Sequence, residues 1–174
     1  MEDGKKKMKI NILYEDNHIL VVEKPINMLS QSDNTKDIDL LTLVKEYIKE
    51  KYQKPGNVYV GLVHRLDRPV GGIMVFAKTS KAASRLSVQI KNHQLKKEYL
   101  AIVNGIIEED EGTYIDKIKR LANGNSIVSN EGKEAILNYH VLKRNEGKNT
   151  TLVKIDLKTG RHHQIRVQFA NRNH

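Results

Sequence analysis

Two short apolar runs enclose a polar, glycine-rich segment in the first half of this chain. The first run covers residues 58–63 and the second covers residues 73–77, and between them residues 64–68 read His-Arg-Leu-Asp-Arg. A proline and two glycines follow before the second run begins. This pattern predicts two strands joined by a loop that carries one carboxylate between two arginines. Because loops on a rigid scaffold often carry function, the loop is the first place to look for a site.

Asp67 is the candidate catalytic residue of this loop. The flanking Arg65 and Arg68 favour its ionised form, because nearby opposite charges stabilise a carboxylate. An ionised aspartate in basic surroundings is a candidate nucleophile toward a polyanionic substrate. A structural ion pair or an ordinary turn residue is the alternative interpretation, since perturbed carboxylates mark functional sites only statistically.

The charge balance of the chain points to a polyanionic partner. The 174 residues include 30 lysines and arginines against 21 aspartates and glutamates, which gives a formal net charge of +9. Such an excess favours binding to a polyanion. An anionic membrane surface would suit the same charge. However, no apolar stretch approaches the roughly 18 residues of a membrane span, and no basic helix has a bulky apolar face, so no membrane partner is expected.

Cysteine is absent from the chain. This excludes disulfides, cysteine-ligated zinc and thiol catalysis. Residues 1–9 are polar and charged, so no secretory signal is visible, and we expect a cytoplasmic protein. Residues 1–10, which include three consecutive lysines, are expected to form a basic flexible tail. Residues 11–174 are expected to form a single domain.

The periodicity of apolar residues predicts an α+β fold with a mixed or mostly antiparallel sheet and packed helices. A first helix is expected to begin near Asp37 or Asp39, a second after Thr79 or Ser80, and a last one near Arg161. Glycine-containing turns separate the later apolar segments, as in antiparallel hairpins. The predicted strands cover residues 12–14, 19–22, 58–63, 73–77, 99–103, 113–118, 135–142 and 151–157.

Three further segments deserve comparison with Asp67. A predicted strand ends at Lys24 and Pro25, where a structural role is the simpler interpretation. Tyr99 lies in a second, alternating strand, where membership of the core is the alternative interpretation. In residues 157–166 a glycine turn leads into a helix start rich in Arg, His and Gln donors. Such a start suits an anionic group, because free N–H groups and the helix dipole point toward it.

A metal site is the competing interpretation of His162 and His163, together with His64, His93 or His140. Adjacent histidines on a helix point in different directions, and no H-E-x-x-H spacing is present. We therefore expect no metal.

Four segments in order resemble the RluA-type family of pseudouridine synthases. Residues 21–25 (Val-Val-Glu-Lys-Pro) are similar to its first motif, and residues 64–78 are similar to its second. Residues 97–105 match the pattern Lys-x-Tyr-x-Ala-x-x-x-Gly, and residues 157–166 resemble the third motif, L-x-T-G-R-x-H-Q-I-R. A lone Arg-Leu-Asp would be weak evidence for this family. Here the order and spacing of four segments match the family from about Asn11 onward.

The resemblance implies the pseudouridine synthase catalytic core and an isomerase that converts uridine in rRNA or tRNA to pseudouridine. The N1–C1′ bond would break, the base would rotate, and C5 would join C1′, with no redox change and therefore no cofactor. Asp67 would be the essential carboxylate. Attack at C1′, addition at C6 and a glycal route all remain open for it. The target uridine would have to leave its stack to reach this residue.

The resemblance also implies roles for other residues. Tyr99 would stack on the uracil and is a candidate for proton transfer at C5, while Arg166 would pair with Asp67 and orient it. Substrate contacts are expected from Arg65 in the space left by the flipped nucleotide, from Ile165 against the base, from Arg161 and Lys24 on phosphate, and from His64 in the second motif.

Two departures from the family pattern stand out. The family commonly has a Thr-Ser-Gly-like stretch after the aspartate, whereas residues 69–72 read Pro-Val-Gly-Gly. Family members also usually continue past the third motif into a Pro-x-x-Gly-Asp segment. We therefore expect a C-terminally incomplete, monomeric core without a separate N-terminal RNA-binding domain. A non-catalytic RNA-binding or ribosome-assembly module, and a small basic nuclease, are the alternative functions.

Overall fold

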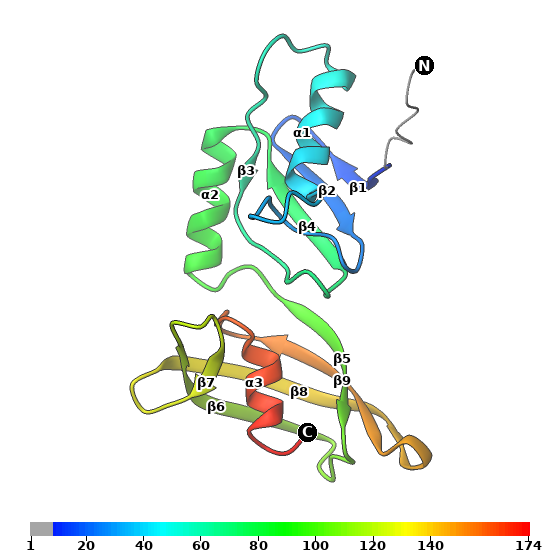
Figure 1. Ribbon diagram of the computed structural model, residues 1–174, viewed down its shortest axis with the longest axis vertical. Helices are drawn as coiled ribbons and strands as arrows, with labels where there is room; N and C mark the ends of the chain where they lie inside the picture. Colours follow the sequence, from blue (N-terminus) through cyan, green and yellow to red (C-terminus); the bar gives the residue numbers. More distant parts are fainter. Residues whose placement is uncertain (1–8) are drawn as a thin grey trace. The chain divides into compact units, whose positions relative to one another are not determined.

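The computed structural model describes residues 9–174, and the chain divides into two compact units between Asn92 and His93. Most of the expected basic tail, including lysines 5–7, lies outside the described residues. Each unit has its own sheet and its own hydrophobic core (Figure 1). The predicted α+β class is confirmed, and every pairing between the named strands is antiparallel. The strands are divided between two sheets.

The first unit contains a four-stranded sheet in the order β1-β2-β4-β3. These strands are β1 (Asn11–Glu15), β2 (Ile19–Lys24), β3 (Gly61–Leu62) and β4 (Gly72–Ala77). The strand predicted over residues 58–63 is therefore reduced to two residues beside β4. The long segment between β3 and β4 contains Asp67, so this unit presents the loop that the sequence predicts.

Helix α1 (Leu40–Lys51) packs on the first sheet. It begins after Asp39, whose carboxylate accepts a hydrogen bond from the Thr42 backbone N–H at 3.0 Å, which is the capping arrangement expected for an aspartate. Its apolar side chains form one core with inward-facing residues of β2 and β4. The fully buried members are Leu20, Val22, Leu40, Val44, Ile48, Met74 and Phe76.

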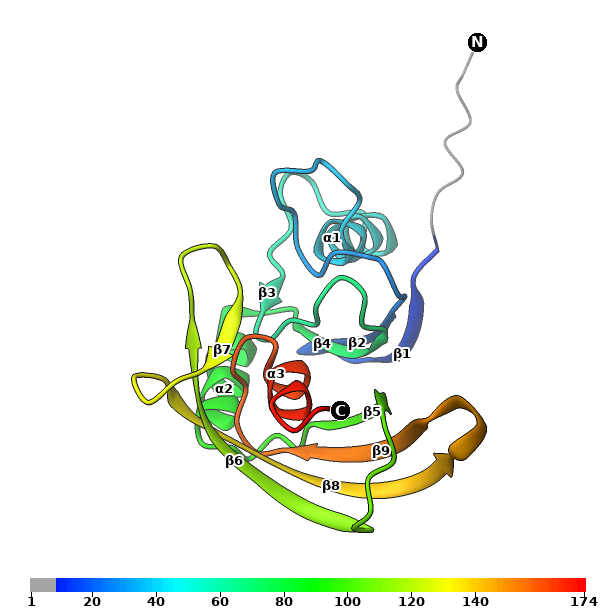
Figure 2. The ribbon, with the colours of Figure 1, turned by 60° about the horizontal axis from the view of Figure 1, so that its bottom comes forward.

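Helix α2 (Ser80–Lys91) begins after Thr79, whose hydroxyl accepts from the Ala82 N–H at 3.1 Å. Figure 2 shows α1 and α2 on opposite sides of the first sheet. The helix approaches the sheet closely at Gly61, where a Cβ would lie only 2.8 Å from the Ala83 Cβ. Glycine at this position therefore permits the packing of α2 against β3.

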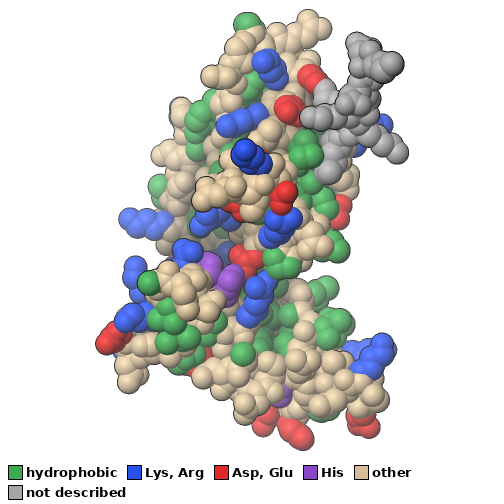
Figure 3. All heavy atoms as spheres, in the orientation of Figure 1, with side chains coloured by type: hydrophobic (Ala, Val, Ile, Leu, Met, Phe, Trp, Pro, Cys, Tyr) green, Lys and Arg blue, Asp and Glu red, His purple; other side chains and the backbone are tan. Residues whose placement is uncertain are grey.

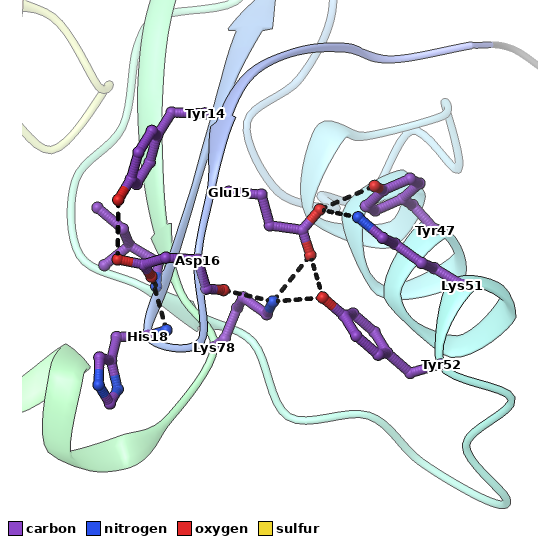
Figure 4. A network of polar contacts seen from close by, with 9 residues as sticks. Tyr14, Glu15, Asp16, His18, Tyr47, Lys51, Tyr52 and Lys78 are labelled. Atoms are coloured by element: carbon purple, nitrogen blue, oxygen red, sulfur yellow. Dashed lines mark hydrogen bonds and ion pairs between the residues drawn. The ribbon is translucent and has the colours of Figure 1, made fainter.

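Glu15 is the centre of a polar network that joins β1 to α1 and to the residue after β4 (Figure 4). Its carboxylate accepts hydrogen bonds from Lys51 at 2.6 Å and Lys78 at 2.8 Å, and from two tyrosine hydroxyls, Tyr47 at 2.8 Å and Tyr52 at 2.7 Å. Burial alone would raise its pKa, but these four donors outweigh burial and lower the pKa of Glu15 to about 2. The network therefore needs a charged carboxylate.

The second unit contains a five-stranded antiparallel sheet in the order β5-β9-β8-β6-β7. Its strands are β5 (Glu98–Asn104), β6 (Glu111–Arg120), β7 (Ser126–Val128), β8 (Lys133–Asn145) and β9 (Thr150–Leu157), with a short 3-10 helix at Glu146–Lys148. The sequence predicts four of these strands and misses β7. In Figure 2 the sheet curves around α3 (Gln164–Ala170).

Helix α3 begins at Gln164, three residues later than expected. The cause is His163, whose left-handed backbone conformation (φ 54°) breaks the helical path just before the helix. Residues 161–163 consequently form a turn. The helix has seven residues and no side-chain cap, and the anion site predicted at its N-terminus stays a prediction.

Candidate functional site

The loop that carries Asp67 is fixed to the first unit by Leu66 and Ser30. The Leu66 side chain packs against the hydrophobic core. The buried Ser30 hydroxyl donates to the Leu66 carbonyl at 2.7 Å and accepts from the Leu66 N–H at 3.1 Å. One side chain thus satisfies both backbone groups of the residue before Asp67, and this arrangement restrains the loop without a regular strand.

Lys24 joins the loop from the end of β2. It is fully buried, and its Nζ donates to the carbonyls of Met28 at 2.6 Å, Pro25 at 3.0 Å and Arg68 at 3.2 Å. Burial lowers the pKa of Lys24, and the negative charge of Asp67 opposes that shift. The prediction that Lys24 binds phosphate is not supported by this position, because a fully buried ammonium with three carbonyl partners is not presented to a ligand.

Asp67 lies partly buried at a turn in which its carbonyl accepts from the Val70 N–H at 3.0 Å. The flanking arginines differ in their surroundings. The Arg68 guanidinium forms an exposed ion pair with Asp37 at 2.7 Å, whereas Arg65 is exposed to solvent. The loop ends at Gly72, whose φ of +148° suits glycine and strains other residues.

His64 is tied to the sheet through its imidazole. The Val75 backbone N–H donates to His64 Nε2 at 3.0 Å, so this nitrogen carries no proton in that arrangement. The contact fixes the start of the loop against β4. The substrate-binding role predicted for His64 stays a prediction, and the structure adds a positioning contact to it.

In the second unit, Tyr99 and Ile165 pack against the same hydrophobic core. Tyr99 lies on β5 opposite Ile155 of β9, and Ile165 lies on the first turn of α3. Both are partly exposed. The two residues that the resemblance assigns to the base, far apart in the sequence, therefore border one core in the second unit.

Two buried glutamines fix α3 to the second sheet. Gln164 donates to the Ile136 carbonyl at 3.1 Å and to Gln168 Oε1 at 2.9 Å. Gln168 in turn donates to Asp116 Oδ2 at 2.8 Å and to two backbone carbonyls of β6 and β8. Because buried amides need partners, this chain of bonds sets the orientation of the helix. Arg166 lies on the exposed side of the same helix.

Arg161 is positioned by the turn before α3. Its backbone N–H donates to Gln164 Oε1 at 2.9 Å, and its Nε donates to the Glu134 carbonyl at 2.7 Å. A shallow groove of about 570 Å³ lies between β7 and α3, lined among others by Ser126, His163 and Arg166. Ser126 also contacts His162 Nδ1 at 3.0 Å, so both histidines of the third segment border the β7 side of this unit.

The predicted site residues thus fall into two sets, one in each unit. Lys24, His64, Arg65 and Asp67 belong to the first, and Tyr99, Arg161, Ile165 and Arg166 belong to the second. Sequence reasoning missed Ser30, Gln164 and Gln168 as organising residues, because no local pattern reveals the distant backbone groups that they bind. Among residues 9–174, no group of three or more metal-binding side chains is found, and no helix is long and apolar enough to cross a membrane.

Comparison with known proteins identifies the family. The family model described as RNA pseudouridylate synthase matches residues 18–171. The chain belongs to this family. The resemblance to its RluA-type members is confirmed by relatives that are named pseudouridine synthases. Among them is ribosomal large subunit pseudouridine synthase D of Pseudomonas aeruginosa, which is 35% identical over 167 residues.

This relative is covered over 50% of its length and this chain over 94%. An uncharacterized RNA pseudouridine synthase of Aquifex aeolicus is 39% identical over 168 residues, which are 95% of this chain and 53% of that protein. The chain therefore spans about half the length of these relatives. Human RNA pseudouridylate synthase domain containing 1 shares the fold, with a TM-score of 0.77 at 24% identity over 100% of this chain and 69% of that one.

Proposed function

We propose that this protein isomerises uridine to pseudouridine in RNA, with Asp67 as the essential carboxylate. The observation that carries the proposal is the restrained loop around Asp67, in which Ser30 and Lys24 hold the adjacent backbone, in a chain of the RNA pseudouridylate synthase family. A fixed carboxylate is what attack on a sugar or a pyrimidine ring requires, because reactivity depends on near-attack geometry.

The reaction needs a bond exchange and two proton movements. The N1–C1′ bond breaks, the C5–C1′ bond forms, C5 loses its proton and N1 gains one. Asp67 can serve attack at C1′, addition at C6 or a glycal route, and the order of steps stays open. We assign Tyr99 to stacking on the uracil face and to proton transfer at C5. Ile165, which packs against the same core, would contact the base.

RNA binding is expected to require extrusion of the target nucleotide. We assign the exposed Arg65 to the space that the nucleotide leaves, Arg161 to phosphate, and Arg166 to pairing with Asp67. His64 keeps the substrate contact predicted for it in addition to its bond to β4. Lys24 is reassigned from phosphate binding to positioning of the loop, because its ammonium is buried among carbonyls.

Large-subunit rRNA is the substrate that we propose, with tRNA as the alternative. The names of two relatives, ribosomal large subunit pseudouridine synthases C and D, point to that RNA for those proteins. The net charge of +9 supports a polyanionic partner, and Figure 3 shows Lys and Arg side chains spread over the face drawn. We propose a cytoplasmic monomer that needs neither metal nor cofactor.

Tritium release from 5-labelled uridine tests the proposal, because C5 must lose its hydrogen. Unmodified large-subunit rRNA transcripts would be incubated with the wild type, with Asp67→Asn and with Asp110→Asn. The last variant makes the same substitution at an exposed residue of the second unit. We expect release by the wild type and by Asp110→Asn, and none by Asp67→Asn. If the wild type binds RNA without release, a non-catalytic binding module replaces the enzyme.

A further inference from the structure

Lys97 is a half-buried cation that the proposed chemistry does not use. It directly precedes β5, and its carbonyl accepts from the Leu157 N–H at 2.9 Å, which ties it to the end of β9. Its Nζ lies over Gly160, at 3.6 Å from the place where a Cβ on that residue would lie. Within residues 9–174, no hydrogen bond or ion pair of this ammonium is found. A half-buried ammonium in this state has unused donors.

Arg161 stands next to Lys97 and is held in place by its own contacts. Its Nε and its backbone N–H are both bonded within the turn. Its two terminal nitrogens make no hydrogen bond to the part of the chain that the structure describes. The guanidinium is therefore fixed, while its outer donors remain available to a ligand.

The positive charge of Arg161 makes the charged form of Lys97 less favourable. Burial lowers the pKa of Lys97, and the positive charge of Arg161 lowers it further, while Asp156 acts in the opposite direction. Asp156 is itself paired with Lys158. Two like charges held together, with the nearest carboxylate already engaged by a third cation, create a place where an anion would be stabilised.

We propose that Lys97 and Arg161 together hold one phosphate of the RNA backbone at the turn formed by residues 159–161. The ligand class rests on the proposed function, which makes RNA the partner. A phosphate can accept from both cations at once through different oxygens, and such a contact positions RNA without reading its sequence. Glycine at position 160 leaves open the space beside the Lys97 ammonium that a side chain would enter.

We call Lys97 and Arg161 the phosphate clamp. Binding of unmodified large-subunit rRNA transcripts tests this clamp. We would compare Lys97→Met, Arg161→Met and the double variant with the wild type over a salt series, and use Lys97→Arg to keep the charge. Lys143→Met is the matched control, because Lys143 is exposed on β8 and takes part in no proposed contact. Circular dichroism would verify that each variant is folded.

Each single methionine variant should bind RNA roughly tenfold more weakly, near the lower end of what a hydrogen bond between charged groups contributes. Lys97→Arg and the control should stay close to the wild type. If both cations hold the same phosphate, the double variant should bind little worse than the weaker single variant. Its plot of log affinity against log salt should become less steep by about 0.7, the value for one phosphate contact in single-stranded nucleic acid.

Three results would overturn the clamp. Unchanged binding by Lys97→Met would remove Lys97 from the interface. If the double variant's loss of RNA affinity equals the product of the two single losses, and its salt slope changes by about twice 0.7, the two cations bind two separate phosphates. A fall in kcat at unchanged KM in both Lys97→Met and Lys97→Arg would make Lys97 a proton-transfer group instead.

The proposed function is judged separately by tritium release from the wild type. Release with unchanged binding by Lys97→Met refutes only the clamp. Binding that depends on Lys97, without release, supports the clamp and refutes only the isomerase.

Discussion

Replacement of Lys24 by methionine tests whether this buried side chain organises the Asp67 loop. Methionine has a similar length and no charge, so the variant removes three hydrogen bonds while filling most of the space. The carbonyls of Pro25, Met28 and Arg68 then lose a donor, and the bond to Met28 is buried. Because Arg68 follows Asp67 directly, the loss acts on the backbone beside the proposed carboxylate.

The expected loss of stability is about 3 kcal/mol. A hydrogen bond from a charged donor contributes roughly 1.5–3 kcal/mol, and the contacts at 2.6 and 3.0 Å are shorter than the third, at 3.2 Å. The removal of a buried charge offsets part of this loss, since burial lowers the pKa of Lys24 and its charged form is therefore costly. A displaced loop should also lower kcat by roughly ten- to a hundredfold.

Urea unfolding measures the first effect and tritium release the second. Lys45→Met is the matched control, because Lys45 is exposed on α1 in the same unit. We expect the control to unfold within about 0.5 kcal/mol of the wild type. If Lys24→Met behaves like the control in both assays, the carbonyl contacts do not hold the loop, and the positioning role assigned to Lys24 is wrong.

Two further predictions concern the first unit. The pKa of Glu15, lowered from 4.5 to about 2, lies below its unfolded value, so its stabilisation is present above pH 4.5 and is lost as the pH falls toward 2. Glu15→Gln should therefore lower the free energy of unfolding at pH 7 by about 2 kcal/mol, a value that allows for the solvent around Lys51. At pH 2 the substitution should cause no such loss. A melting temperature equally reduced at both pH values would contradict this. Ser30→Ala leaves both backbone groups of Leu66 without their partner and should cost about 1–2 kcal/mol with a lower kcat, whereas an unchanged kcat would show that the loop needs no such restraint.

Helix starts were the most predictable part of the fold. Asp39 and Thr79 precede apolar stripes at helical spacing, and the structure uses both as caps. Such signals depend on contacts within a few residues. The apolar spacing predicts the start of α3 too early, because His163 adopts a left-handed conformation that a non-glycine residue rarely shows. Strand β7 is not evident from the sequence, because its three residues are too few for a visible alternation.

The candidate site was predictable where chemistry is local and not where it depends on distant backbone. Asp67 stands out because a polar cluster interrupts two apolar runs. The resemblance implies phosphate binding by Lys24, and its burial is not evident from the sequence because lysines are rarely fully buried. Its actual partners include a carbonyl 44 residues further along the chain. The same limit explains Gln168, whose bonds to β6 and β8 span 54 and 33 residues.

The Asp67 loop combines residues that hold it with residues that face solvent. His64 binds the backbone of β4 through its ring, and Leu66 is fixed by the core and by Ser30. Arg65, between them, is exposed. Substitutions at 64 and 66 should therefore act through the geometry of the loop, and should lower stability together with turnover. A substitution at Arg65 should instead weaken RNA binding and leave stability unchanged, because only the backbone of that residue is needed by the fold.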